Sequence, residues 1–220
     1  MSVVYLLRHG QASFGAENYD VLSAGGIQQS KVAGKELARR DVVVAAAHCG
    51  TLQRQRDTSA AALAECAPGM VAVRDARFNE YDFADIVAHH GAPADADMTD
   101  PRAYQRALDA ALLDWMAAGD SSPCARRWPE FSGDARAALD EVVAGLGKGK
   151  QAVITTSGGI IATLCADLLG APAETVPALN RVAVNAGLTK LISGRAGTTL
   201  VSFNEHGHFD GEAASLLSYR

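Results

Sequence analysis

Short apolar runs along this chain are separated by stretches with helical spacing of apolar residues. The continuous runs at 3–7, 42–47, 70–73 and 151–156 are typical of buried strands. Two final strands, joined by a turn around residues 193–197, are expected at Arg181–Ile192 and Thr198–Phe203. Helices are expected at 25–40, from Thr51 to about 64, and at 103–116, 131–146 and 160–169. Strands that alternate with helices predict an α/β fold, a three-layer αβα sandwich with a mostly parallel sheet.

The pattern weakens between Ala84 and Pro129, where turn-forming glycines and prolines are frequent. Only 103–116 has clear helical spacing within this segment. A chain of 220 residues buries a sizeable core as one domain. We therefore predict a single domain over 1–220, with a helical insertion at about 84–129 that covers the active site.

The first apolar run ends in Arg8, His9, Gly10 and Gln11. Ligands of open α/β sheets bind beyond the carboxyl ends of the strands, which is where these residues are expected. Arg8 is a permanent planar cation suited to phosphate oxygens. His9 is a candidate nucleophile or proton carrier, and Gly10 lets the backbone approach a ligand closely.

Two further segments are suited to an anion. Arg54 lies in the first turn of a helix for which Thr51 is the candidate N-cap; a cation there opposes the helix dipole unless an anion binds beside it. Ser157, Gly158 and Gly159 turn the chain from the run at 151–156 into the next helix, a geometry that offers backbone N–H groups to phosphate.

Composition excludes several classes of protein. A net charge of −5 argues against a general nucleic-acid binder, and no segment has the length of a membrane span or the pattern of a signal peptide. The four cysteines are widely spaced and contain no Cys-x-x-Cys, as is usual for reduced thiols. We predict a cytoplasmic protein without nucleic-acid or membrane partners.

The pairs His89-His90 and His206-x-His208 lack carboxylates at metal-ligand spacing, so no metal is predicted.

Five short motifs occur in an order that resembles the histidine phosphatase superfamily, the phosphoglycerate-mutase-like fold, over nearly the whole chain. They are Leu7-Arg8-His9-Gly10, Leu22-Ser23-x-x-Gly26-x-x-Gln29, Leu52-Gln53-Arg54-x-Arg56-x-Thr58, Asn79-Glu80-Tyr81-Asp82 and Thr156-Ser157-Gly158-Gly159. The resemblance implies that His9 attacks a phosphoryl group and becomes phosphohistidine, that Arg8 and Arg54 hold the phosphoryl oxygens, and that Glu80 protonates the leaving oxygen. It implies a phosphohydrolase that acts on a small phosphorylated metabolite without a metal or another cofactor. The residues expected to bind substrate are Gly10, Gln11, Ser157, Gly158 and His208.

The sequence departs from the family where Ser157 stands in place of a second histidine. A serine donates one neutral hydrogen bond, and loss of a charged donor could lower the rate on the order of 10²–10³. Activity could be low, another residue such as His208 or His48 could substitute, or only anion binding could remain. The stretch around His208 resembles the tail of many family members, which favours a structural role for it.

Two alternatives to hydrolysis stay open: a cofactor-dependent phosphomutase, and a phospho-ligand-binding protein that has lost catalysis. Family members often carry Thr and Asn where Ala12 and Gly15 stand here. The chain also lacks the longer aromatic loop of glycolytic phosphoglycerate mutases, which favours hydrolysis of monoesters over mutase activity. The final strands leave a homodimer open.

Overall fold

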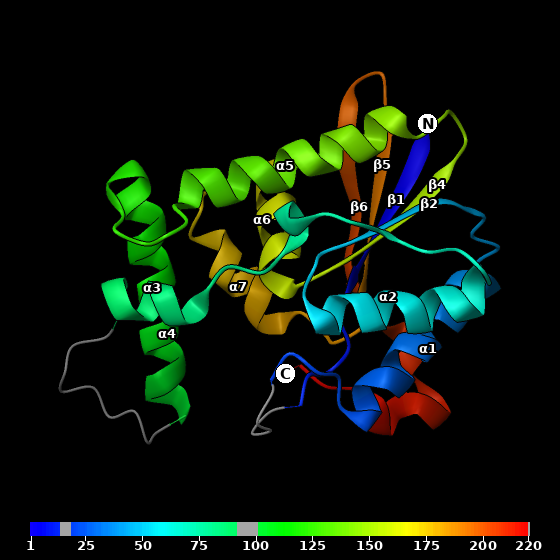
Figure 1. The fold of residues 1–220 in the computed structure, drawn as a ribbon, viewed down its shortest axis with the longest axis horizontal. Helices are drawn as coiled ribbons and strands as arrows, with labels where there is room; N and C mark the ends of the chain where they lie inside the picture. Colours follow the sequence, from blue (N-terminus) through cyan, green and yellow to red (C-terminus); the bar gives the residue numbers. More distant parts are fainter. Residues whose placement is uncertain (14–18, 92–100, 220) are drawn as a thin grey trace.

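The computed structural model describes residues 1–13, 19–91 and 101–219; for residues 101–105 it describes the backbone alone. Six strands form one sheet in this part of the chain (Figure 1). In spatial order the strands are β3 (Val73–Arg74), β2 (Val44–Cys49), β4 (Gln151–Thr156), β1 (Ser2–Arg8), β5 (Leu188–Gly194) and β6 (Gly197–Glu205). The first four are joined by parallel pairings, and β1–β5 and β5–β6 are antiparallel. The predicted mostly parallel sheet is confirmed.

Helices cover both faces of this sheet (Figure 1). The α-helices of the described residues are α1 (Ala24–Arg39), α2 (Gln53–Cys66), α3 (Phe83–His90), α4 (Pro101–Ala118), α5 (Trp128–Gly145), α6 (Gly158–Leu168) and α7 (Thr175–Val182). Short 3₁₀ turns lie at η1 (Ala76–Phe78), η2 (Gly119–Ser121), η3 (Gly207–Phe209) and η4 (Gly211–Leu216). None of the helices in the described residues combines the length and the apolar character needed to cross a bilayer.

The side chains of β1 alternate between two separate apolar cores. Val4 and Leu6 pack in the core that contains α4, α5 and α6, whereas Tyr5 and Leu7 pack in the core that contains α1 and α2. Successive strand side chains point to opposite faces of a sheet, so a strand that is buried throughout lies between two helical layers. This arrangement confirms the predicted three-layer sandwich.

The predicted strand at Arg181–Ile192 is wrong in its first half. Residues 175–182 form α7, and β5 begins only at Leu188. Between them Val184 and Ala186 are fully buried in a loop, where the Ala186 N–H donates to the carbonyl of His9 (3.3 Å). A buried apolar loop has the same local pattern as a buried strand, and only its tertiary hydrogen bonds distinguish the two.

Several element boundaries also differ from the expectation. The second strand covers 44–49 rather than 42–47, and the third is limited to 73–74. The apolar side chain of Ile27 in the first helix is 40% exposed. Helix α3 was not predicted, because the segment that follows Ala84 carries no clear periodicity.

Helices α3 and α4 lie at one end of the molecule, beside α5 and α7 rather than on the sheet (Figure 1). Trp115 of α4 packs against Tyr81 (ring centroids 5.8 Å apart) and Trp128 (5.4 Å). Since Tyr81 follows Glu80 directly, α4 supports the backbone that carries this carboxyl group. Residues 92–100 of the predicted insertion lie outside the described residues.

The chain leaves β1 toward β2 on one side, and leaves β4 toward β5 on the other. Because β1 and β4 are neighbours, their carboxyl ends form a topological switch point, the usual place of a ligand site in an open α/β sheet. The first candidate residues, His9 and Ser157, directly follow these two strands.

Candidate active site

His9 is fixed directly beyond β1. Its backbone N–H donates to the carbonyl of Thr156 at the end of β4 (2.8 Å), and its side chain is 6% exposed. The imidazole Nδ1 lies 2.7 Å from the carbonyl oxygen of Gly10, and Arg54 Nε–H donates to Nε2 (3.2 Å). The hydrogen-bond network therefore assigns the proton to Nδ1. The lone pair of Nε2 is then the reactive one.

The pKa of His9 lies well below its usual value. Burial is the main cause, and the positive charges of Arg8 and Arg54 add to it; the hydrogen bond to Gly10 opposes it. Burial and nearby cations both disfavour the imidazolium form. His9 is consequently neutral near pH 7, as nucleophilic attack requires.

Arg54 is positioned by Asp20. The Arg54 guanidinium donates to Asp20 Oδ1 through NH1 (2.7 Å), while the backbone N–H of Gln53 donates to Asp20 Oδ2 (2.7 Å). Arg54 is 9% exposed, so this ion pair holds a nearly buried cation against the His9 ring. Asp20 was missed in the sequence because it lies in a polar loop without a motif.

The start of α2 differs from the expectation, since the N-cap position is Leu52 and not Thr51. Thr51 instead pairs with Asn79: its N–H donates to Asn79 Oδ1 (2.6 Å), and Asn79 Nδ2 donates to Thr51 Oγ1 (2.7 Å). This reciprocal pair ties the helix that carries Arg54 to the residue before Glu80.

Arg8 is held by main-chain oxygens from distant parts of the chain. Its NH1 donates to the carbonyl of Ala183 and to the carbonyl of Tyr219 (2.9 Å). These carbonyl acceptors fix the orientation of the guanidinium at the end of β1.

The Glu80 carboxyl group meets the amino end of α6. Oε2 accepts from the Gly159 N–H (2.9 Å) and Oε1 accepts from the Tyr81 N–H (3.2 Å). A Cβ at position 159 would overlap this carboxyl group and the Tyr81 ring, so only glycine allows the close approach. Burial raises the pKa of Glu80, although these hydrogen bonds and the charges of Arg54 and Arg8 oppose the shift. A raised pKa favours a carboxyl group that can donate a proton.

Ser157 is fully buried beside Gln55. Gln55, also fully buried, donates from Nε2 to Ser157 Oγ (2.8 Å) and to the carbonyl of Phe78 (3.0 Å). Because Ser157 Oγ accepts this hydrogen bond, its own O–H remains able to donate. Gln55 was missed because a glutamine in the first turn of a helix carries no signal for a site.

Gly158 lies against Arg8. A Cβ there would overlap Asn180 Oδ1 and would come within 3.3 Å of Arg8 Nε. Asn180 Nδ2 in turn donates to the Tyr81 hydroxyl (2.9 Å). Asn180 and Tyr81 therefore line the same region as Arg8 and Gly158, which the sequence did not indicate for Asn180.

Gly10 and Gln11 continue from His9 toward α1. The Gly10 N–H donates to Thr58 Oγ1 (3.0 Å), and a Cβ at this position would overlap the Gly26 carbonyl of α1. The Gln11 N–H donates to Gln29 Oε1 (2.7 Å). Close packing on α1 explains the glycine at position 10.

In the described part of the chain, His208 and His48 form their contacts with residues other than His9. His208 Nε2 lies 3.1 Å from the carbonyl of Ala186, and its ring packs on Phe209 (4.3 Å between centroids). His48 lies within β2, where burial lowers its pKa. Among the described residues neither histidine hydrogen-bonds to His9 or Ser157.

A family model of the histidine phosphatase superfamily (branch 1) matches residues 4–206. The chain belongs to this superfamily. The match includes the motifs around His9, Arg54, Glu80 and Ser157, and it confirms the family suggested by the sequence.

Solved structures of two phosphatases and a phosphoglycerate mutase share the fold. A histidine-to-alanine mutant of phosphoserine phosphatase from Entamoeba histolytica, in complex with phosphoserine, is 17% identical with a TM-score of 0.65, and covers 94% of this chain and 99% of its own. The mycobacterial glucosyl-3-phosphoglycerate phosphatase is 23% identical with a TM-score of 0.65, and the match covers 92% of this chain and 98% of the phosphatase. A phosphoglycerate mutase from Bacillus anthracis is 18% identical with a TM-score of 0.66, and the match covers 94% of this chain and 94% of the mutase. No curated protein matches the sequence significantly.

Proposed function

We propose that this histidine phosphatase homologue is a phosphohydrolase that cleaves phosphate monoesters through a phosphohistidine on His9. The observation that carries the proposal is the neutral His9 ring, with its Nε2 lone pair held beside the Arg54 guanidinium. Nucleophile and cation are thus already arranged for attack on a phosphoryl group.

In the first step Nε2 of His9 attacks phosphorus, and the bond from phosphorus to the ester oxygen breaks. Glu80 gives its proton to that oxygen and is left as a carboxylate. In the second step a water molecule attacks the phosphohistidine, Glu80 takes a proton from the water, and the phosphorus–nitrogen bond breaks. Inorganic phosphate leaves, and both residues return to their starting states. Arg8 and Arg54 stabilise the charge on the phosphoryl oxygens throughout.

We further propose that Ser157 takes the place of the second family histidine as a neutral donor. Its hydroxyl group accepts from Gln55 and is free to donate to a phosphoryl oxygen. The N–H of Gly158 is the first of α6, and a Cβ at this position would come within 3.3 Å of Arg8 Nε. A backbone N–H at the start of a helix favours an anion, which would compensate in part for the missing cation.

The substrate in this proposal is a small phosphorylated metabolite, bound without a metal or another cofactor in the cytoplasm. Two structural neighbours are phosphatases whose names specify monoesters, phosphoserine and glucosyl-3-phosphoglycerate, which supports this substrate class. Gly10, Gln11 and His208 remain predicted contacts around it.

The first experiment measures hydrolysis of an aryl phosphate from roughly pH 5 to 8, the range in which a histidine titrates. It compares the wild type with His9→Ala and Ser157→His. Wild-type turnover that disappears in His9→Ala supports the phosphohydrolase and means that Ser157 suffices. Trapping of ³²P on the wild type, but not on His9→Ala, checks the intermediate.

Ser157 also favours a second candidate, a protein that binds phosphate esters without turning them over. If the wild type does not hydrolyse the aryl phosphate and Ser157→His does, the result would favour that candidate. If all three proteins are inactive while a phosphate ester binds, the proposed chemistry is wrong. A phosphomutase would instead transfer the phosphoryl group to an added alcohol or sugar hydroxyl faster than to water.

A further inference from the structure

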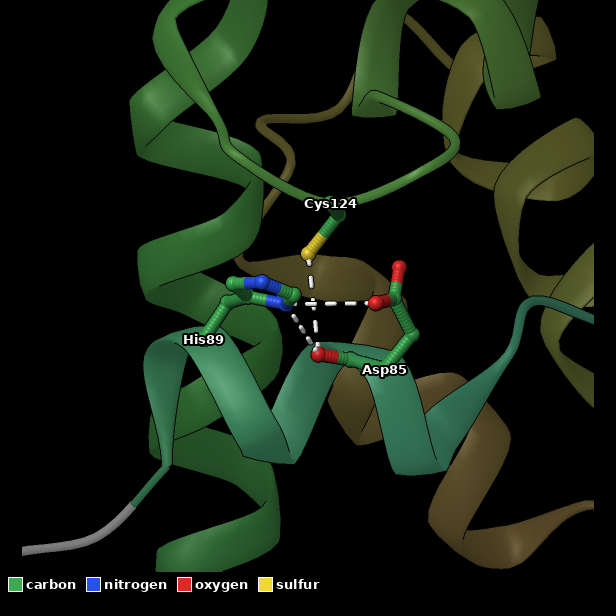
Figure 2. Close-up of side chains that lie close together, drawn as sticks. All are labelled: Asp85, His89 and Cys124. Carbon is green, nitrogen blue, oxygen red and sulfur yellow. Dashed lines mark hydrogen bonds and ion pairs between the residues drawn. The ribbon is translucent and has the colours of Figure 1, made fainter.

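We propose that Asp85, His89 and Cys124 form a site for a single zinc-like divalent ion, separate from the catalytic residues. Asp85 and His89 come from α3, and Cys124 comes from the loop between η2 and α5, 35 residues later in the chain than His89. Figure 2 shows the three side chains converging on one point. One ligand atom from each residue lies within 4.8 Å of the other two.

The helix brings the first two ligands together. Residues four apart lie on the same face of an α-helix, and His89 Nδ1 is 3.1 Å from Asp85 Oδ1. Two ligands of tetrahedral zinc, with bonds of about 2.0–2.2 Å, are roughly 3.3–3.6 Å apart. The carboxylate and the imidazole are therefore already close to the spacing that an ion requires.

The thiol completes the set after a small movement. Cys124 is 6% exposed, and its Sγ makes only a long contact with the Asp85 carbonyl oxygen (3.9 Å). This contact is weak, so a metal competes with little that would be lost. A zinc–thiolate bond of about 2.3 Å requires the sulfur to approach by roughly 1 Å.

The surrounding backbone already orients two of the ligands. The Ala125 N–H donates to Asp85 Oδ2 (2.8 Å), which leaves Oδ1 to the metal, in the manner of an outer-shell hydrogen bond. Trp115 Nε1–H donates to the carbonyl of Arg126 (3.0 Å) and fixes the same loop on α4. His89 Nδ1 must give up its hydrogen bond to the Asp85 carbonyl (2.9 Å) when it binds.

The ligand types select the metal. Thiolate with imidazole and carboxylate suits zinc and its neighbours, whereas magnesium and calcium prefer oxygen alone. Three protein ligands leave a fourth position for water. Bound there, the ion would fasten α3, which begins three residues after Glu80, to the loop before α5. The role is therefore structural, and it stabilises the segment that follows the general acid.

The test titrates Co²⁺ and then Zn²⁺ into the full-length reduced protein after removal of metals with a chelator. We expect one equivalent of Co²⁺ to produce a cobalt–thiolate charge-transfer band that Zn²⁺ then displaces. Cys124→Ser abolishes the band. Asp85→Asn and His89→Gln weaken binding on the order of 10-fold or more. Bound Zn²⁺ slows alkylation of Cys124 and raises the midpoint of thermal unfolding.

Two matched variants serve as controls. Cys66→Ser removes a half-buried thiol elsewhere, and His90→Ala removes the neighbouring imidazole, which instead contacts Ser122 (2.8 Å). Both are expected to bind the metal as the wild type does, and circular dichroism verifies that each variant is folded. The proposal fails if the folded wild type gives no cobalt–thiolate band. It fails equally if the band survives in Cys124→Ser or disappears in Cys66→Ser.

Discussion

In the proposed mechanism the two sides of the candidate active site would bind a phosphoryl group in different ways. On one side Arg8 and Arg54 supply two permanent charges, and both act on His9. On the other side Ser157 supplies a neutral hydroxyl group that Gln55 orients, together with the Gly158 N–H at the start of α6. The charged side belongs to the chain around β1 and α2, and the neutral side includes the turn after β4.

This contrast indicates which side controls which property. Burial is the main cause of the lowered pKa of His9, and the two cations lower it further, so the charged side contributes to the protonation state of the proposed nucleophile. The neutral side adds directed hydrogen bonds without altering that state. A third cation at position 157 would lower the pKa of His9 further, whereas serine avoids this effect.

Removal of Arg54 is expected to have the largest effect. Arg54→Ala deletes a charge beside the transferred phosphoryl group and the hydrogen bond to His9 Nε2. We expect kcat/KM for an aryl phosphate to fall on the order of 10³-fold. Arg136→Ala, on the surface of α5, is the matched control and should leave the rate unchanged. Equal losses in the two variants would contradict the cationic role.

Replacement of Glu80 is expected to depend on the leaving group. Glu80→Gln cannot donate a proton, so turnover of phosphoserine should fall on the order of 10²–10³-fold. An aryl phosphate with an acidic phenol needs little protonation and should lose less than about 10-fold. Glu141→Gln, an exposed carboxylate on α5, is the control. Equal losses on both substrates would remove Glu80 from the role of acid.

The neutral side is expected to act as a coupled pair. Ser157→Ala should lower kcat about 10–10²-fold, and Gln55→Leu about 3- to 10-fold because the hydroxyl group loses its orientation. The double variant should be no slower than Ser157→Ala alone, since Gln55 acts through the serine. Fully additive losses in this cycle of rates would show that Gln55 has only a structural role.

The smallest expected effect is a change in titration, followed by NMR of the His9 ring. Protonated His9 cannot attack, so kcat/KM falls as the pH drops through the pKa of His9. Because burial and both arginines lower this pKa, the fall is expected below the usual range of imidazole. On the alkaline side, activity falls as the pH rises through the raised pKa of Glu80. Arg54→Ala should raise the pKa of His9, and Ser157→Ala should not change it.

The residues that follow continuous strands were predictable from the sequence. The strands β1 and β4 are buried on both faces, so their apolar runs are uninterrupted and the chemistry that follows them is conspicuous. The second strand was placed two residues early because polar His48 lies inside it and pairs with β4. Local patterns do not record such pairings, which depend on a distant strand.

The supporting residues were not predictable for the same reason. Asp20, Gln55 and Asn180 act through hydrogen bonds to residues far away in the chain. Each is a common polar residue in a loop or helix, and only the folded chain shows which of them is buried against the site. The grouping of Cys124 with α3 is equally non-local.

The hydrogen bond between Arg8 and the Tyr219 carbonyl has a practical consequence for handling this protein. Its carbonyl oxygen, next to the last residue of the sequence, holds a guanidinium of the candidate active site. Met1 directly precedes β1, at the end of this strand opposite to Arg8. A purification tag or a fluorophore attached beside Tyr219 would disturb the segment that positions Arg8. We therefore expect a tag attached before Met1 to affect Arg8 less.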